Sequence, residues 1–240
     1  MARDTSEIEW LGALNWIRAQ KIRPSPPDTR LPSEDALAKE SRYTKSIVRR
    51  ALQQLVANEE ITSKKGSGYY TLFNFNRSVS LVKALEPNTI NVDYTEVNDM
   101  KIVNADDDVS KYLKIRPGEK IIYFKTKRFV CHNNKKRPCL MSTHYIRNDK
   151  VDFKNFTRNL QACRSVSSAI REERVTAYLR TFTDINSRFP LAEERKALLL
   201  SPLDIVIETR GVNSDFDKDP IELTISCWPS HIWNMRFEFQ

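Results

Sequence analysis

Residues 31–52 read LPSEDALAKESRYTKSIVRRAL, and this stretch predicts two helices separated by a short turn. Ser33 can accept hydrogen bonds from the first free N–H groups of a helix that ends near Ser41. Thr44 can do the same for a longer helix that runs to about Asn58. The stretch therefore predicts a helix-turn-helix.

The second of these helices has two different faces. One is apolar and comprises Ile47, Val48, Ala51, Leu52 and Leu55. The other is polar and basic and comprises Lys45, Ser46, Arg49, Arg50 and Gln53. Because each set recurs at helical spacing, we expect the apolar face to pack and the basic face to stay open to a partner.

A basic hairpin is expected after the two helices. Residues 61–65 and 69–72 are β-prone, and they flank Gly66-Ser67-Gly68, where glycine permits a tight turn. Lys64 and Lys65 stand at its tip. In this order, the elements place one helix in a major groove and a wing on adjacent phosphates. Each element alone is also typical of a solvated surface, so their order and spacing favour a winged-helix DNA-binding domain.

The chain upstream of the motif is expected to form one more helix. Trp10, Leu14 and Ile17 recur at helical spacing, and the helix must end before Pro24. The formal net charge is +8, which suits a polyanionic partner but also many proteins that bind no polyanion. Between residues 42 and 77 there are seven basic and two acidic side chains. The positive charge is thus concentrated in the expected DNA-binding domain.

The composition excludes several classes of protein. The 240 residues can form two ordinary domains. No apolar run approaches the roughly 20 residues that a membrane span needs, and residues 1–18 carry acidic side chains where a signal peptide would be apolar. The four cysteines form no close C-x-x-C pair, and the three histidines match no metal-ligand spacing. We expect a cytoplasmic protein with no metal, no cofactor and no membrane association.

Several of these motifs resemble the N-terminal domain of the GntR family of transcription regulators. The resemblance covers nearly all of residues 8–72, and its motifs are Leu31-Pro32-Ser33-Glu34, Leu37-Ala38, Thr44-Lys45-Ser46, Val48-Arg49-Arg50-Ala51-Leu52 and Gly66-Ser67-Gly68. The resemblance implies a recognition helix and a minor-groove wing. We expect the DNA-binding residues to be Ser33, Thr44, Lys45, Ser46, Arg49, Arg50, Lys64, Lys65, Gly66, Ser67 and Gly68.

Two positions depart from the usual pattern of this family. Asp35 stands where many relatives have an arginine, and Lys45 stands where arginine is common. Lysine keeps the positive charge but lacks the two-pronged donor geometry that binds guanine. We therefore expect Lys45 to contact phosphate, and we expect one family contact to be altered at Asp35.

The rest of the chain is predicted to be a linker, residues 73–80, and a mainly β domain, residues 81–240. Residues 121–130 alternate as a strand, which places Arg128 on the same face as Ile122 and Phe124 if no bulge intervenes. Such an arginine either reaches water or a carboxylate at a strand end, or binds an anion.

Further elements are predicted from the same patterns. Residues 165–174 and 191–200 are expected to be helices, and residues 175–186 a strand. Residues 221–228 predict a strand with Glu222, Thr224, Ser226 and Trp228 on one face and Ile221, Leu223, Ile225 and Cys227 on the other. The last strand alternates in the same way, with Trp233, Met235, Phe237 and Phe239 on one face.

Residues 107–239 are similar to the UTRA effector-binding domain of the HutC subfamily of GntR regulators, whose fold resembles chorismate lyase. This looser similarity rests on Pro117-Gly118, Lys127-Arg128, Pro138, Tyr145, Ser165, Ala169-Ile170, Arg180 and Asp219-Pro220-Ile221-Glu222. The runs Cys139-Leu140, His144-Tyr145 and Arg180-Thr181-Phe182-Thr183 further resemble regulators of phosphonate utilisation. The expected fold class is α+β, with a winged helix-turn-helix at residues 1–72 and a mainly antiparallel sheet with flanking helices in the second domain.

The similarity implies an effector cleft lined by Arg128, Ser142, Ser165, Ser167, Arg180, Thr183, Glu222 and Trp228. Two guanidiniums and two hydroxyls suit an anion such as a phosphate or phosphonate, and Glu222 would orient a donor group of the ligand. Ser142 replaces a frequent carboxylate and Trp228 a usual tyrosine. If the domain has no such cleft, Glu222 is a solvent-facing strand residue and Trp228 is an aromatic residue that only packs.

The function expected from these features is an effector-responsive regulator, a repressor that binds a short palindromic operator as a homodimer and senses a small anion. One alternative is a lyase-like enzyme, but residues 78–240 contain no recognisable nucleophile–base pair, metal set or phosphate-binding glycine loop. We expect no catalytic residues. The other alternative is a DNA-binding protein whose second domain only dimerises.

Overall fold

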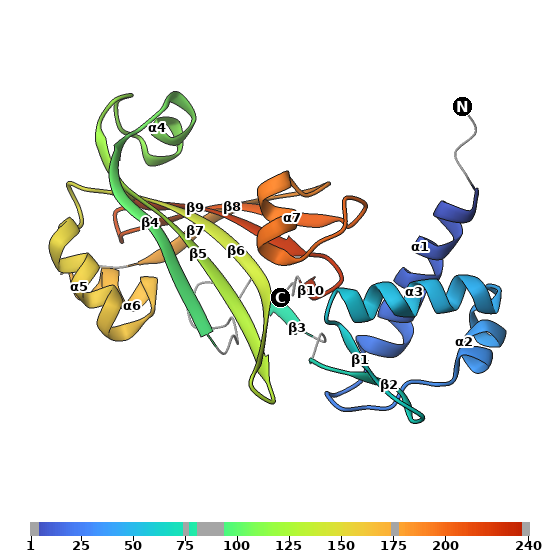
Figure 1. Ribbon diagram of the computed structural model, residues 1–240. Helices are drawn as coiled ribbons and strands as arrows, with labels where there is room; N and C mark the ends of the chain where they lie inside the picture. The colour runs from blue at the N-terminus through green and yellow to red at the C-terminus, as the bar shows by residue number, and fades with distance from the viewer. Residues whose placement is uncertain (1–4, 74–76, 81–93, 174–177, 237–240) are drawn as a thin grey trace. The chain divides into compact units, whose positions relative to one another are not determined.

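The computed structural model describes residues 5–73, 77–80, 94–173 and 178–236, and the chain divides into two compact units (Figure 1). Unit 1 comprises Met1–Ser78, Val130–Arg137 and Ser230–Asn234. Unit 2 comprises Val79–Phe129, Pro138–Pro229 and Met235–Gln240. The expected domain limits at residues 72 and 80 stay predictions, and β3 (Arg77–Ser80) of the expected linker pairs with β10 (Trp233–Arg236).

Unit 1 contains the expected three helices and hairpin. In chain order its elements are α1 (Thr5–Ile17) with a π-helical turn, η1 (Arg18–Ile22), then α2 (Glu34–Ser41), α3 (Lys45–Ala57), β1 (Ile61–Lys64) and β2 (Gly68–Thr71). Ser33 and Thr44 cap α2 and α3, because their hydroxyl oxygens accept from the backbone N–H groups of Ala36 and Ile47 at 3.2 and 3.5 Å. Each such cap contributes on the order of 1 kcal/mol to stability.

The core of unit 1 forms from the apolar face of α3. Val48, Ala51, Leu52 and Leu55 are fully buried, as are Ile17 of α1 and Leu37 of α2. Burial of each large aliphatic side chain stabilises the fold by roughly 1.5–3 kcal/mol. The predicted division of α3 into a packed and an open face is therefore confirmed, since Lys45, Ser46 and Arg49 are exposed.

Unit 2 is built on a six-stranded antiparallel sheet with strand order β4-β5-β6-β9-β8-β7. Its strands are β4 (Tyr94–Asn104), β5 (Lys120–His132), β6 (Lys135–Arg147), β7 (Leu179–Arg188), β8 (Val206–Ser214) and β9 (Pro220–Pro229). Its helices are α4 (Asp107–Leu113), α5 (Phe153–Cys163), α6 (Val166–Arg171) and α7 (Ala192–Leu198). The expected α+β class is confirmed.

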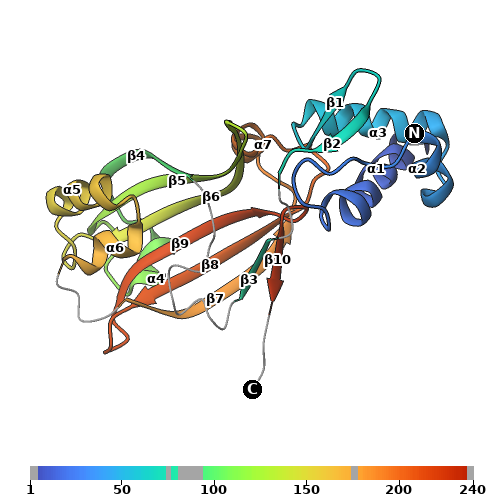
Figure 2. The same cartoon turned by 90° about the horizontal axis from the view of Figure 1, so that it is seen from below.

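Helices cover both faces of this sheet. On one face, α5 and α6 pack on a cluster that includes Phe124, Ile146 and Phe156 (Figure 2). On the other, α4 packs on a cluster that includes Ile121 and Leu223. The strands therefore carry buried side chains in both directions, and β9 is not half-exposed as a solvent-facing strand would be.

The structure corrects the set of side chains expected on one face of β9. Ile221 packs in the cluster under α5 and α6, whereas Leu223 packs in the cluster under α4, so the two do not share a face. The physical reason is a register shift between Asn213 and Ser214 of β8, which pair with Glu222 and Pro220 on either side of Ile221.

Other expected elements are partly covered by the described residues. The helix expected at residues 165–174 is present as α6 and the strand expected at 175–186 as β7, while residues 174–177 lie outside the description. The expected last strand is present as β10, whereas Phe237 and Phe239 lie outside the described residues. Within the described chain, no helix combines the length and apolarity that a membrane crossing requires.

Candidate functional site

Two of the three cations that α3 is expected to present to DNA are held by carboxylates of α2. Nζ of Lys45 lies 2.8 Å from Oδ1 of Asp35, and Nη2 of Arg49 lies 2.8 Å from Oε2 of Glu34. The hydrogen bond from Arg49 to Glu34 raises the pKa of the guanidinium. These side chains are thus positioned on the protein surface before any DNA arrives.

The neighbouring expected contacts are also engaged within the protein. The Ser33 and Thr44 hydroxyls cap helices, and the Thr44 and Ser46 hydroxyls lie 3.0 Å apart. The guanidinium of Arg50 lies over the ring of Trp10, 4.9 Å from the ring centroid. This cation–π contact directs Arg50 toward α1.

The hairpin β1–β2 forms the expected wing. Gly66 and Gly68 have φ values of +74° and +109°, a region that side-chain-bearing residues rarely adopt. Nζ of Lys64 lies 4.3 Å from the centroid of the Tyr70 ring, and the Ser67 and Tyr70 hydroxyls are 2.6 Å apart. Lys65 is exposed at the tip.

A buried ionic cluster, which the sequence patterns did not predict, follows the end of α3. Oε1 of Glu60 lies 2.6 Å from Nη2 of Arg18, and 3.7 Å from Nη2 of Arg137, which also belongs to unit 1. Burial alone would raise the pKa of Glu60, but the charges of Arg18, His231 and Arg137 lower it to about 2. The cluster ties η1, which directly continues α1, to the segment that follows α3.

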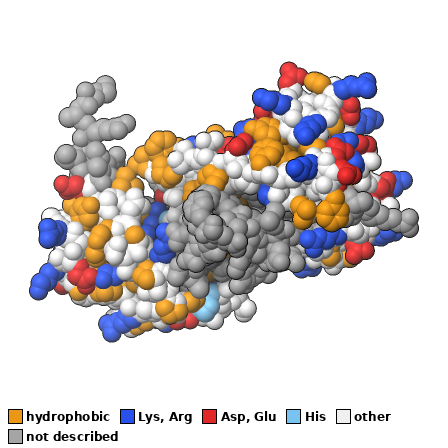
Figure 3. Space-filling model, turned by 180° about the vertical axis from the view of Figure 1, so that it is seen from behind, with side chains coloured by type: hydrophobic (Ala, Val, Ile, Leu, Met, Phe, Trp, Pro, Cys, Tyr) orange, Lys and Arg blue, Asp and Glu red, His pale blue; other side chains and the backbone are white. Residues whose placement is uncertain are grey.

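On one face of the molecule, charged side chains of both signs are mixed (Figure 3). On the face that Figure 3 presents, Lys and Arg side chains are interspersed with Asp and Glu. This face therefore offers no broad positive surface to a polyanion.

Within unit 2, a buried polar network is centred on Glu222 of β9. Nδ1 of His144 donates to its Oε1 at 2.7 Å, while Asn213 Nδ2 at 2.6 Å and the Tyr178 hydroxyl donate to Oε2. The Thr126 hydroxyl lies 2.9 Å from Nε2 of His144. Burial alone would raise the pKa of Glu222, but His144, Tyr178 and Arg180 lower it to about 2. The carboxylate is therefore ionised and already accepts three hydrogen bonds.

Arg128 lies on β5, two residues beyond Thr126 and therefore on the same face. Its Nε is inaccessible to solvent and has no hydrogen-bond partner among the described residues. Burial lowers the pKa of its guanidinium, an effect that the nearby Glu222 partly offsets. The expected placement of Arg128 on the face of Ile122 and Phe124 is consistent with this neighbourhood.

Arg180 approaches the same carboxylate from β7. A Cβ on Gly211 of β8 would lie only 1.6 Å from Nη1 of Arg180, so the absence of a side chain at position 211 makes room for the guanidinium. The charge of Arg180 contributes to the low pKa of Glu222. The structure thus brings Arg128, Arg180 and Glu222 together.

The other expected effector residues are placed as follows. Ser165 caps α6 and its hydroxyl lies 3.1 Å from that of Ser167, on the helix that packs against the same cluster as Phe124 and Tyr178. The Ser142 hydroxyl lies 2.8 Å from that of Ser226. Trp228 is buried and its Nε1 donates to Thr209 at 2.8 Å, and Thr183 lies opposite Gly211.

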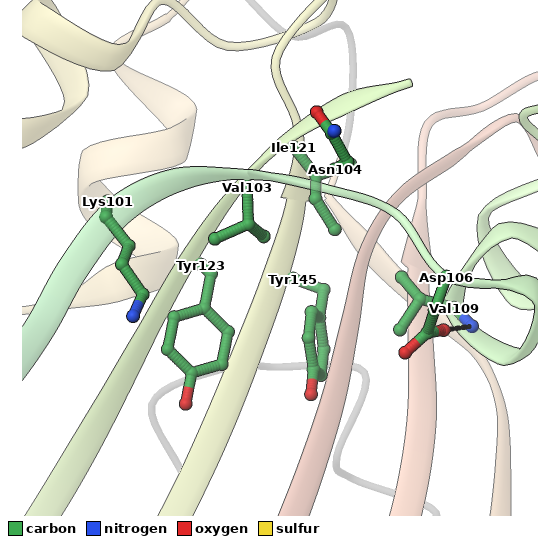
Figure 4. Close-up of a pocket in the computed structure, with 8 residues that line it drawn as sticks. All are labelled: Lys101, Val103, Asn104, Asp106, Val109, Ile121, Tyr123 and Tyr145. Atoms are coloured by element: carbon green, nitrogen blue, oxygen red, sulfur yellow. Dashed lines mark hydrogen bonds between the residues drawn. The ribbon is translucent and has the colours of Figure 1, made fainter. Parts of the chain in front are cut away.

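A pocket of about 270 Å³ lies on the opposite face of the sheet, beside α4 (Figure 4). It is lined by Lys101, Val103, Asn104, Asp106, Val109, Ile121, Tyr123 and Tyr145. The Tyr123 and Tyr145 ring centroids are 5.5 Å apart, and burial raises the pKa of Tyr145. None of the expected effector residues lines this pocket.

The comparisons with known proteins agree with both halves of this description. The family model of bacterial regulatory proteins of the gntR family matches residues 15–70, and the UTRA domain model matches residues 93–232. The HTH-type transcriptional regulator RB1450 of Rhizobium meliloti (strain 1021) is 25% identical over 214 residues, which cover 87% of this chain and 85% of that relative.

Two solved structures share the fold. PhnF from Mycobacterium smegmatis has a TM-score of 0.56 at 14% identity, over 95% of this chain and 99% of that chain. YydK from Bacillus subtilis has a TM-score of 0.54 at 16% identity, over 99% of this chain and 100% of that chain. The matched family consists of bacterial regulatory proteins rather than enzymes, and YydK is described as a possible transcriptional regulator. This chain belongs to the GntR-family transcription regulators that carry a DNA-binding helix-turn-helix domain and a UTRA domain.

Proposed function

We propose that the protein is a repressor that binds a short palindromic operator as a homodimer and responds to a small anionic effector. The main support for an anionic effector is the Nε–H of Arg128, which is inaccessible to solvent and has no acceptor among the described residues. A buried donor without an acceptor costs about 1–3 kcal/mol. An anion that accepts from it would recover this cost on binding.

The chemistry around Arg128 supports a phosphate ester or phosphonate. Arg180 supplies a second guanidinium, and Ser165 and Ser167 supply hydroxyls, so the group can present several donors to a tetrahedral anion. Glu222 enters this proposal as a positioning residue, because its oxygens already accept from three protein donors. Ser142, Thr183 and Trp228 are proposed as further parts of the cleft wall.

We infer dimerisation from the geometry of DNA and not from a contact between two copies of the chain. One recognition helix reads one half-site, and two copies related by a two-fold axis reach successive major grooves of a palindrome. The effector can change operator affinity only if it binds the DNA-bound and DNA-free states with different affinities. Sedimentation of the full-length protein with and without operator DNA measures the stoichiometry.

A thermal-shift screen tests the effector proposal. The panel contains methylphosphonate, phosphorylated sugars, imidazole carboxylic acids and fatty acids. An effector at 100 times its Kd should stabilise the protein by about 2.7 kcal/mol. We expect phosphonates or phosphate esters to raise Tm and to change operator binding. A panel in which no anion raises Tm would favour a second domain that only dimerises.

Gly211→Ala is expected to weaken effector binding with little change in Tm. The new Cβ would overlap Nη1 of Arg180, and the flexible arginine side chain would move away from Glu222. Effector titrations of Gly211→Ala, Arg180→Ala and the double variant measure the coupling. If Gly211 acts by making room for Arg180, the substitution has no further effect in the Arg180→Ala background. Independent, additive losses would contradict this role.

Lys65→Ala is expected to reduce the salt dependence of operator binding. Each phosphate contact contributes about 0.9 to the slope of log K against log salt concentration, and Lys65 is exposed at the wing tip. Binding isotherms at several salt concentrations measure the slope. Lys39→Ala, an exposed lysine in the last turn of α2, removes the same charge and should leave the slope unchanged. Equal slopes for both variants would exclude a phosphate contact by Lys65.

A further inference from the structure

Asp35 and Lys45 form an ion pair whose side chains are largely exposed to solvent. Their side chains are 74% and 48% exposed, and Nζ of Lys45 lies 2.8 and 2.9 Å from the two carboxylate oxygens. So exposed a pair contributes little to the stability of the fold. Its place in the first turns of α2 and α3, beside Thr44 and Ser46, calls for another explanation.

The neighbouring pair of Glu34 and Arg49 differs in this respect. Glu34 is only 20% exposed and also lies 3.4 Å from the hydroxyl of Tyr69 on the wing, so it ties α2, α3 and β2 together. Asp35 has no hydrogen-bond partner other than Lys45 among the described residues. Glu34 is therefore part of the scaffold, whereas Asp35 keeps acceptor positions available to a partner.

A lysine beside a carboxylate presents one donor and one acceptor to the edge of a base pair. In the major groove, guanine offers two acceptors, N7 and O6, and its partner cytosine offers the N4 amino donor. The C5–H of cytosine leaves one side of that amino group open to a carboxylate. The amino group of adenine instead lies between two acceptors, its own N7 and O4 of thymine, which repel a carboxylate.

We propose that Asp35 is a specificity-determining residue that accepts a hydrogen bond from the N4 amino group of a cytosine in each operator half-site. Lys45 stays beside it and donates a single hydrogen bond to guanine, in place of the phosphate contact expected from the sequence alone. This inference rests on the proposed operator binding by α3. An anionic side chain close to DNA is unfavourable unless it meets a donor, so Asp35 also disfavours sequences that lack cytosine at this position.

Selection of bound sequences from a randomised duplex library tests the proposal. The full-length wild-type protein is compared with Asp35→Ala and with a matched control, Glu40→Ala, which removes an exposed acid of α2 that pairs with Lys21. We expect the wild type and Glu40→Ala to select the same sequences. Asp35→Ala should lose a cytosine preference of roughly tenfold or more at one position of each half-site.

The outcomes separate the two levels of the proposal. If Asp35→Ala keeps the wild-type base preferences and only binds all sequences more tightly, Asp35 is a nonspecific electrostatic brake and the proposal is overturned. If the wild type selects no sequence at all, operator binding itself fails, and the role of Asp35 fails with it. Unchanged thermal unfolding of Asp35→Ala is the check that the variant is folded.

Methylated DNA gives a second, independent readout. A methyl group on C5 of the selected cytosine lies next to N4 and blocks the approach of a carboxylate. The wild type and Glu40→Ala should bind the duplex with 5-methylcytosine at that position about tenfold more weakly than the unmethylated duplex. Asp35→Ala should bind both duplexes equally. Equal binding of both duplexes by the wild type would contradict the contact.

Discussion

Glu222→Ala is expected to lower the free energy of unfolding by about 3–5 kcal/mol, the range for loss of one partner from a buried charged pair. The substitution leaves Nδ1 of His144, the Tyr178 hydroxyl and the Asn213 amide buried without their acceptor. Urea unfolding of the full-length protein, followed by circular dichroism, measures the change. Glu208→Ala, which removes a less buried carboxylate from β8, should cost much less.

The same carboxylate should make the protein sensitive to acid. The pKa of Glu222 is about 2 in the folded protein against 4.5 for an unperturbed carboxyl, so the unfolded state binds more protons between these values. The stabilising contribution is complete above about pH 4.5 and is lost as the pH falls toward 2. Glu222→Gln should therefore reduce the loss of stability in acid. The substitution should not abolish the acid sensitivity, because the pKa of Glu60 is also about 2. An unchanged pH dependence would show that Glu222 is not ionised in the fold.

Arg128→Met is expected to weaken effector binding by about 30-fold to several thousandfold, the range for loss of one partner of a buried charge pair, 2–5 kcal/mol. The unfolding free energy should change by no more than about 1 kcal/mol, because methionine fills a similar volume and removes a buried donor that lacks an acceptor. Isothermal titration with the anion that gives the largest thermal shift measures the affinity.

Lys127→Met is the matched control for Arg128→Met. Lys127 is the preceding residue of β5, points to the other face of the sheet and pairs with Glu96 at 3.4 Å. The variant loses the same charge from the same strand and should bind the effector normally. Equal losses in the two variants would mean that only the overall charge matters. A strong destabilisation by Arg128→Met would assign Arg128 to the scaffold.

The sequence predicted unit 1 well because its signals are local. The caps at Ser33 and Thr44 and the spacing of Val48, Leu52 and Leu55 each act within one or two turns of helix. The carboxylate partners of Lys45 and Arg49 were missed, because they depend on how α2 crosses α3. Glu60 was missed for the same reason, since Arg18 lies 42 residues away in the chain.

The network around Glu222 could not be predicted, because it depends on strand order and register. His144 and Glu222 are 78 residues apart and meet because β6 pairs with β9, while Asn213 lies directly opposite Glu222 on β8. Alternation on β9 placed Glu222 on a polar face, but it did not reveal that this face is buried. The donors His144, Tyr178 and Asn213 therefore became visible only in the fold.

The carboxylates of α2 that pair with Lys45 and Arg49 should also affect how the protein is distributed over a genome. A chromosome offers on the order of 10⁶–10⁹ competing sites, and nonspecific affinity for them comes almost entirely from phosphate neutralisation. Asp35 and Glu34 hold two of the exposed cations of the recognition helix and so reduce the charge available to arbitrary DNA. We therefore expect fewer copies to be sequestered on unrelated sequence, so that a small number of molecules suffices to occupy the proposed operator.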